Sequence, residues 1–162
     1  MAVARRGLYI RHRRSVLELS SAQQASLDAE QALLLGTVGE GAAGQGTLEL
    51  VLGTPQKKRN RVRLPMEVKI PLDFPTLVPI KVRGQEARQL DLELRVAALD
   101  DKGERSEVPV VPIQLQIPPP PPNVHITYEA VVELRNASQR LAVTLHDKLS
   151  GEALSTVVEV AP

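Results

Sequence analysis

A glycine-rich stretch has the spacing of a known chemical motif. Residues 39–44 read Gly-Glu-Gly-Ala-Ala-Gly, which is the G-x-G-x-x-G pattern of a dinucleotide-binding loop. Such a loop binds pyrophosphate because its glycines lead directly into the N-terminus of a helix. Here the predicted helix precedes the glycines, and the strand-like segment TLELVL follows them. We therefore interpret the stretch as a linker and expect no cofactor.

Carboxylates, histidines and serines also occur, but not with the spacing of a metal or catalytic site. The segment LDDKGE at 99–104 has Asp100 first and Gly103 fourth in a type I turn pattern, and Lys102 interrupts any calcium-loop spacing. His125 and His146 fall on the polar side of strand patterns, so we predict that both face solvent. Neither zinc-ligand spacing nor a G-x-S-x-G nucleophile motif is present. The sequence predicts a protein that is not an enzyme; an enzyme with a dispersed site is the alternative.

A dense basic cluster, QKKRNRVR at 56–63, raises the question of nucleic-acid binding. Lysines and arginines bind phosphates, and single-stranded nucleic acid also requires aromatic side chains for base stacking. The cluster contains no aromatic residue, and Arg61 and Arg63 fall on the polar side of a strand pattern. We interpret the cluster as a solvated turn and strand, and nucleic-acid binding is a further alternative.

Composition limits the class of protein. The 162 residues carry a net charge of +1 and are 43% hydrophobic, with two tyrosines and one phenylalanine as the only aromatic residues. The core must therefore be built from aliphatic side chains. The sequence contains no cysteine, which excludes disulfides and thiolate metal sites. No apolar run approaches the roughly 20 residues that a membrane-spanning helix needs.

Alternation of apolar and polar residues predicts the strands that must position any site. The clearest example is RVRLPMEVKIPL at 61–72, whose apolar residues all fall on one face. Pro65 and Pro71 cannot donate ladder hydrogen bonds, so this strand is predicted to be an edge strand or a bulged one. The residues predicted to form an interaction edge are those on its polar face, namely Arg61, Arg63, Glu67 and Lys69.

The same alternation recurs along the rest of the chain. It predicts further strands over 48–52, 90–98, 111–117, 124–134, 141–145 and 154–160, and helix-forming residues with capping-box spacing at Ser21 and Gln24 predict a helix over 22–35. Five prolines at 118–122 predict an extended crossover between two sheets. The predicted fold is all-β: an antiparallel sandwich of the immunoglobulin or fibronectin III type, with about seven to eight strands and one N-terminal helix. Residues 1–46 would form a basic segment, helix and linker, and residues 47–162 the sandwich.

Several sequence segments, in their order along the chain, resemble those of a protein family. They are RRGLYIRHR, a helix that ends EQALLLG, RVRLPMEVKIPLDFPTLVP, LELRVAALDDKGERSEVPVVPIQLQIP and LRNASQRLAVTLHDKLSGEALSTVVEV. They resemble the C-terminal β-rich region of the bacterial VWFA-related proteins of the Acidobacteria type, in which it follows a von Willebrand factor A domain. That domain binds a metal ion through D-x-S-x-S, a motif that this chain lacks.

The resemblance implies a non-catalytic structural or protein-interaction module that binds a protein partner, with an adjacent von Willebrand A domain as one candidate. It implies an exported or cell-envelope protein if the chain is a fragment, whereas a complete chain would be expected in the cytoplasm. We expect no small-molecule substrate, no metal and no membrane span.

Overall fold

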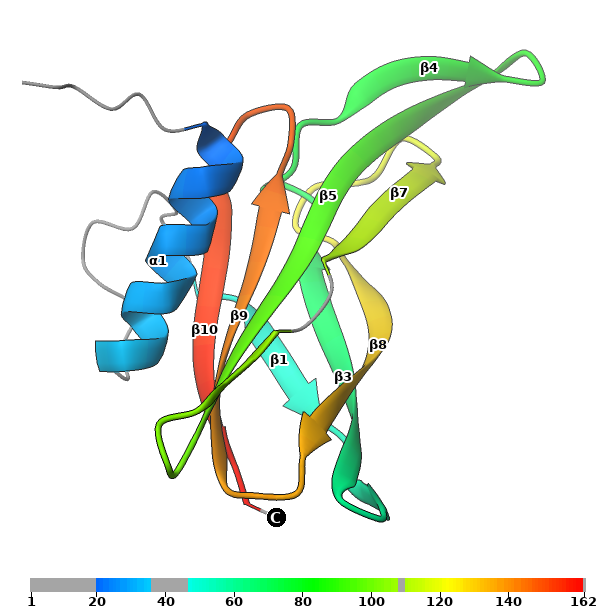
Figure 1. Ribbon diagram of the computed structural model, residues 1–162. Coiled ribbons are helices and arrows are strands. Elements are labelled where there is room, and N and C mark those ends of the chain that lie inside the picture. Colours follow the sequence, from blue (N-terminus) through cyan, green and yellow to red (C-terminus); the bar gives the residue numbers. More distant parts are fainter. Residues whose placement is uncertain (1–19, 36–46, 108–109, 162) are drawn as a thin grey trace, which may run out of the picture.

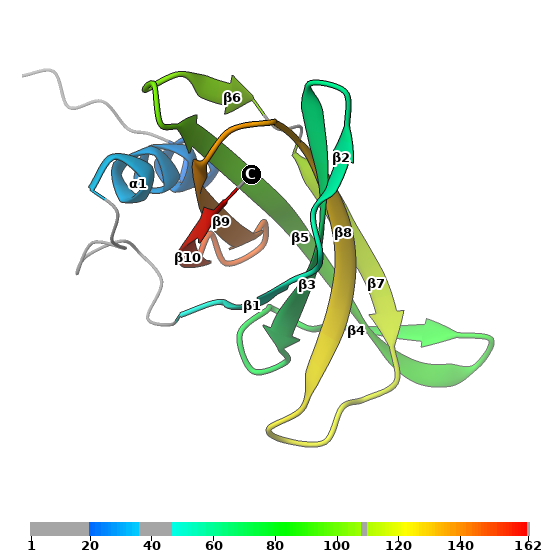
Figure 2. The same cartoon turned by 90° about the horizontal axis from the view of Figure 1, so that it is seen from below.

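The computed structural model describes residues 20–35, 47–107 and 110–161. These residues form one helix and ten strands, arranged as two antiparallel sheets (Figures 1 and 2). The elements are α1 (Ser21–Leu35), β1 (Glu49–Leu52), β2 (Gln56–Lys58), β3 (Arg61–Pro71), β4 (Val78–Val82), β5 (Gln85–Asp100), β6 (Arg105–Glu107), β7 (Val111–Ile117), β8 (His125–Arg135), β9 (Gln139–Asp147) and β10 (Ala153–Val160).

The four-stranded sheet is organised around β3. Strands β1 and β2 pair in succession with one side of β3, and β8 pairs with the other side over its whole length. Burial alternates strictly along β3, as the sequence pattern predicts, with the apolar side chains inside. The buried residues are Val62, Leu64, Met66, Val68 and Ile70.

Strand β3 is not a sheet edge, so the edge predicted from its prolines is wrong. The Pro65 carbonyl accepts a hydrogen bond from the Gly53 N–H at 2.8 Å, which places the backbone nitrogen of Pro65 on the same side. That side faces residues 53–55, the interval between β1 and β2, where no strand partner needs an N–H donor. Pro71 lies beyond Lys69, which pairs with the first residue of β1. Both prolines therefore fit in a central strand.

The six-stranded sheet is organised around the 16-residue strand β5. Strands β4 and β9 pair in succession with one side of β5, β6 and β7 pair with the other side, and β10 pairs with β9. The β4–β5 hairpin projects beyond the remainder of the sheet (Figures 1 and 2). The three short strands β2, β4 and β6 were not predicted, because segments this short show little alternation.

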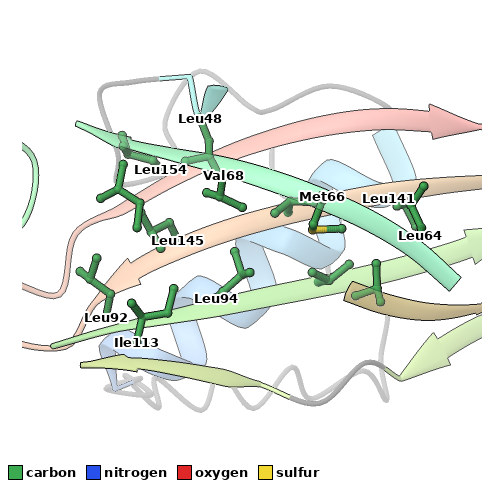
Figure 3. Packing of buried hydrophobic residues seen from close by; sticks show 14 of the residues in the cluster. Leu48, Leu64, Met66, Val68, Leu92, Leu94, Ile113, Leu141, Leu145 and Leu154 are labelled. Carbon is green, nitrogen blue, oxygen red and sulfur yellow. The ribbon is translucent and has the colours of Figure 1, made fainter. Parts of the chain in front are cut away.

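The core lies between the two sheets and is almost wholly aliphatic. Figure 3 shows Leu64, Met66 and Val68 of β3 facing residues from β5 and β9. Strand β7 precedes the proline run and belongs to the six-stranded sheet, whereas β8 follows the run and belongs to the other sheet. The predicted crossover and the prediction of a mostly antiparallel β protein are therefore confirmed.

Helix α1 covers the outer face of the six-stranded sheet beside β9 and β10 (Figures 1 and 2). Its capping box uses Ser20 and Gln23 rather than the predicted Ser21 and Gln24. The Ser20 N–H donates to Gln23 Oε1 at 2.9 Å, and the Gln23 N–H donates to Ser20 Oγ at 3.3 Å. Leu33 is the main apolar contact of the helix with the sheet, packed in a small cluster with Ala142.

Candidate functional site

The four residues predicted from the sequence share the outer face of the four-stranded sheet. Arg61, Arg63 and Glu67 are exposed, and Lys69 is half-buried. Their side chains face away from the core because the buried residues of β3 alternate with them. The structure therefore brings them onto one surface, but in the centre of the sheet rather than at its edge.

Three of these residues already have partners on neighbouring strands. Arg61 and Arg63 each lie 3.7 Å from a carboxylate oxygen of Glu133 on β8. Lys69 Nζ lies 2.9 Å from Glu49 Oε2 on β1, and this hydrogen bond with the lysine charge lowers the pKa of Glu49 below its ordinary value. These exposed pairs contribute little to stability. Glu49 compensates Lys69 at one end of the surface, whereas Arg61 and Arg63 share the single carboxylate of Glu133 at the other.

Glu67 has no cationic partner among the residues that the structure describes. It lies directly opposite Glu129 of β8 in the ladder, and Glu129 likewise has none among those residues. Like charges directly opposite one another on neighbouring strands are destabilising. The centre of this face therefore carries two uncompensated carboxylates, which a cationic group from outside would stabilise.

Strand β8 is the exposed edge next to these residues. The bond from the Leu72 N–H to the Val124 carbonyl, 2.9 Å long, shows that even-numbered residues of β3 direct their backbone groups toward β8. The even-numbered residues of β8 complete this ladder. The odd-numbered residues direct their N–H and C=O groups away from it, and within the described chain no strand pairs with them. They include Thr127, Glu129, Val131 and Glu133.

The other sheet edges are shorter or partly blocked. At β10 the Ser155 carbonyl accepts a bond from the Leu48 N–H at 3.3 Å, so a neighbouring segment covers part of that edge. The bond from the Asp100 N–H to the Glu104 carbonyl shows that even-numbered residues of β5 direct their backbone groups toward β6 and β7. Pro112 of β7 lies opposite Glu93, an odd-numbered residue, so its backbone groups point to the outside of the sheet. Because proline has no N–H, this edge lacks a donor at that position. The 11-residue β8 contains no proline, none of the described segments covers it, and its register with β3 is uninterrupted.

The core is also incompletely covered beside β8. Along its inner face, Val132 is buried, whereas Ile126 and Tyr128 nearer its beginning are only half-buried. Leu115 and Ile117 of β7 are half-buried as well, although they pack against the same core. An added strand at β8 would therefore find unpaired backbone groups and partly exposed apolar side chains together.

A polar cavity of about 650 Å³ lies near Arg61, at the end of the sheets. Arg135 binds both Asp100, at 3.5 Å, and Glu104 there. The Glu104 N–H is the main cause that keeps the pKa of Asp100 below its ordinary value, against the effect of burial and with help from the Lys102 N–H and Arg135. These groups close the β5–β6 turn, where Gly103 has the positive φ expected of it. The cavity is therefore lined by charges of both signs, several of which form ion pairs with one another.

The prediction that His146 faces solvent is wrong. Its side chain is 2% exposed, because β9 has the core on one face and α1 on the other. Its Nδ1 lies 3.8 Å from Glu93 Oε2, too far for a hydrogen bond, and neither ring nitrogen has a partner in the described part of the chain. His125 is exposed, as predicted.

This polar cluster beneath α1 also contains two hydroxyl groups. Thr144 Oγ1 and Ser155 Oγ lie 2.9 Å apart and are buried. Arg95 donates to Ser26 Oγ of α1 at 2.8 Å and to Glu93 at 2.6 Å. A catalytic triad needs a nucleophile hydrogen-bonded to the base and a place for substrate beside it. No hydrogen bond joins His146 to either hydroxyl, and all three residues are buried.

The remaining sequence motifs form a hairpin or lie outside the described residues. The glycine-rich stretch at 39–44 lies outside the described residues. The basic cluster forms the β2–β3 hairpin, with Arg59 in the left-handed region at φ 57°. In the described ranges no group of three metal-ligating side chains comes together. No described helix is long and apolar enough to cross a membrane.

Comparison with known proteins gives little further information. No protein-family model matches the chain, and no curated protein matches it. A solved structure described as "X-ray structure of Northeast Structural Genomics Consortium target SoR45" is 16% identical, over 71% of this chain and 83% of that one, with a TM-score of 0.33. This likeness is too distant to carry an argument.

Proposed function

We propose that this protein is a non-catalytic interaction module that binds an extended segment of a partner protein as an added strand at β8. The observation that supports it is the unpaired 11-residue edge, which combines free backbone groups with a partly covered core. Backbone hydrogen bonds supply affinity in such complexes, and alternate side chains supply specificity. The site is thus β8, with Arg61, Arg63, Glu67 and Lys69 on the adjoining strand.

We further propose that the fold is of the immunoglobulin or fibronectin III type. The order β1-β3-β8 in one sheet and β10-β9-β5-β7 in the other corresponds to strands A-B-E and G-F-C-C′ of that architecture. In this correspondence β8 is strand E. The sequence resemblance supports a place beside a von Willebrand A domain in an exported or cell-envelope protein, and a segment of such a domain is a candidate partner.

A proline at Val131 tests strand addition without disturbing the fold. The Val131 N–H points away from β3, so Val131→Pro removes an outward donor and leaves the β3–β8 ladder intact. Val131→Thr is the matched control, because it keeps the N–H and the branched side chain. A library of short random peptides is selected on the unaltered protein, and each enriched peptide is measured on both variants.

We expect peptides whose binding survives Val131→Thr and falls about tenfold or more in Val131→Pro, which corresponds to one lost backbone bond and a steric clash. Circular dichroism and thermal unfolding check that both variants fold. No enriched peptide, or peptides that bind both variants equally, would contradict the proposal.

A further inference from the structure

We infer that the strand bound at β8 is amphipathic, with Lys or Arg facing outward beside Glu129 and aliphatic side chains facing inward over the core. This inference rests on the proposed function and specifies the chemistry of the partner. It follows from the two faces of β8, because in the described chain the outer face has unpaired carboxylates and the inner face has half-buried apolar side chains.

In the described part of the chain, no cation pairs with the two carboxylates at the centre of the outer face. Glu67 and Glu129 lie opposite each other, while the nearest cations, Arg63 and Lys69, are engaged by Glu133 and Glu49. A residue opposite Glu129 on an added strand would have its Cβ about 5 Å away. A lysine or arginine there would lie against Glu129 and within reach of Glu67, and would relieve their repulsion. An acidic residue there would add a third negative charge.

The next outward position on β8 is apolar. Val131 is 53% exposed and stands between Glu129 and Glu133 on the outer face. A partner strand that alternates charged and aliphatic residues along its own outer face would match this order. A partner strand with charged residues at every outward position would fit less well, because one of them would lie opposite the apolar Val131.

Among the described residues, the apolar side chains on the inner face are only partly covered. Ile126, Tyr128 and Ala130 of β8 are half-buried, and across the same side of the core so are Leu115 and Ile117 of β7. Inward side chains of an added strand would extend over these residues. Burial of apolar surface contributes roughly 25 cal/mol per Å², so aliphatic residues are favoured there over polar ones.

Blocked peptides of defined pattern test this assignment. The first repeats Val-Lys-Val-Val, which places valine at every inward position and alternates lysine with valine at the outward positions. The second has glutamate in place of lysine, and the third has serine in place of the inward valines of the first. Binding to the full chain is followed by NMR chemical-shift changes in β8 at low ionic strength. The valine–lysine peptide should bind about fivefold more tightly than each of the others.

Charge reversal on the protein supplies the decisive comparison. The double variant Glu67→Lys and Glu129→Lys should prefer the valine–glutamate peptide. Glu86→Lys with Glu152→Lys changes the net charge equally at exposed positions away from β8, and it should keep the preference for lysine.

The outcomes separate the two proposals. The inference is supported if the Glu67→Lys and Glu129→Lys variant alone prefers the valine–glutamate peptide. Binding that Val131→Pro abolishes but that shows no charge preference, or equal reversal in both double variants, overturns the inference and leaves strand addition standing. Shift changes that Val131→Pro does not alter, or no binding of any peptide, overturn both the inference and the proposed function.

Discussion

At the scale of single residues, Asp147 links two loops that are far apart in sequence. Its Oδ2 accepts bonds from the Thr76 N–H at 2.8 Å and Ser150 Oγ at 2.9 Å, and its Oδ1 accepts one from the Leu149 N–H at 3.0 Å. Burial acts to raise the pKa of Asp147, but these donors outweigh it and the pKa lies below its ordinary value. The charged form therefore stabilises the fold.

This linkage predicts a sensitivity to acid. A carboxyl group with a lowered folded-state pKa contributes stability above the unfolded pKa, near 4, and that contribution is lost as pH falls through the folded value. Asp147→Asn should lower the free energy of unfolding by about 1–3 kcal/mol at neutral pH and flatten its dependence between about pH 5 and pH 2. Urea denaturation at a series of pH values measures this. Asp73→Asn, at an exposed site, is the control. The prediction is contradicted if the unfolding free energy depends equally on pH in the unaltered protein and in both variants.

His146 is the second residue whose environment has a measurable consequence. Four of the five buried side-chain polar atoms without a hydrogen bond in the described residues lie on the outer face of the six-stranded sheet, and two of them are the ring nitrogens of His146. An unsatisfied buried polar group costs about 1–3 kcal/mol. His146→Leu has a similar volume and removes both nitrogens, so unfolding free energy should stay the same or rise by about 1 kcal/mol.

Chemical denaturation measures the effect, with His125→Leu at an exposed position as the matched control. A loss of more than about 1 kcal/mol in His146→Leu would show that the ring makes bonds that stabilise the fold.

At the scale of elements, the comparison of β3 with β8 shows what a sequence pattern can specify. Alternation correctly predicted which face of β3 and of β8 is turned to the core, because side-chain direction depends only on the strand itself. Edge position depends on neighbours that the pattern does not show. Pro65 suggested an edge, yet it faces the interval between β1 and β2, while the true edge β8 contains no proline. The predicted site residues were therefore placed beside the edge instead of on it.

The same argument applies to the outer face of β9. The pattern assigned His146 to solvent, although it is buried, as are Ala142 and Thr144 on the same face of β9. Alanine and threonine at two successive outward positions are small, which is typical of a surface that a helix covers. That feature was the available signal, but it does not identify the covering element.

At the scale of the whole molecule, the two sheets enclose an aliphatic core that is less well covered beside β7 and β8. The proline run joins these two strands and carries the chain from one sheet to the other. Among the described strands each is the last of its sheet on this side, so the core is bounded there by two edges that do not pair with each other. The shape of the molecule, more than any motif, therefore supports an added strand.

Residue-resolved amide hydrogen exchange along β8 is the most direct test of this account. In the free protein, the even-numbered amides such as Ala130 and Val132 should exchange slowly, because they bond to β3, while Glu129, Val131 and Glu133 should exchange rapidly. A peptide whose binding Val131→Pro abolishes should slow the odd-numbered amides about tenfold or more. Odd-numbered amides that are already protected in the free protein, or that remain rapid when the peptide is bound, would contradict strand addition at β8.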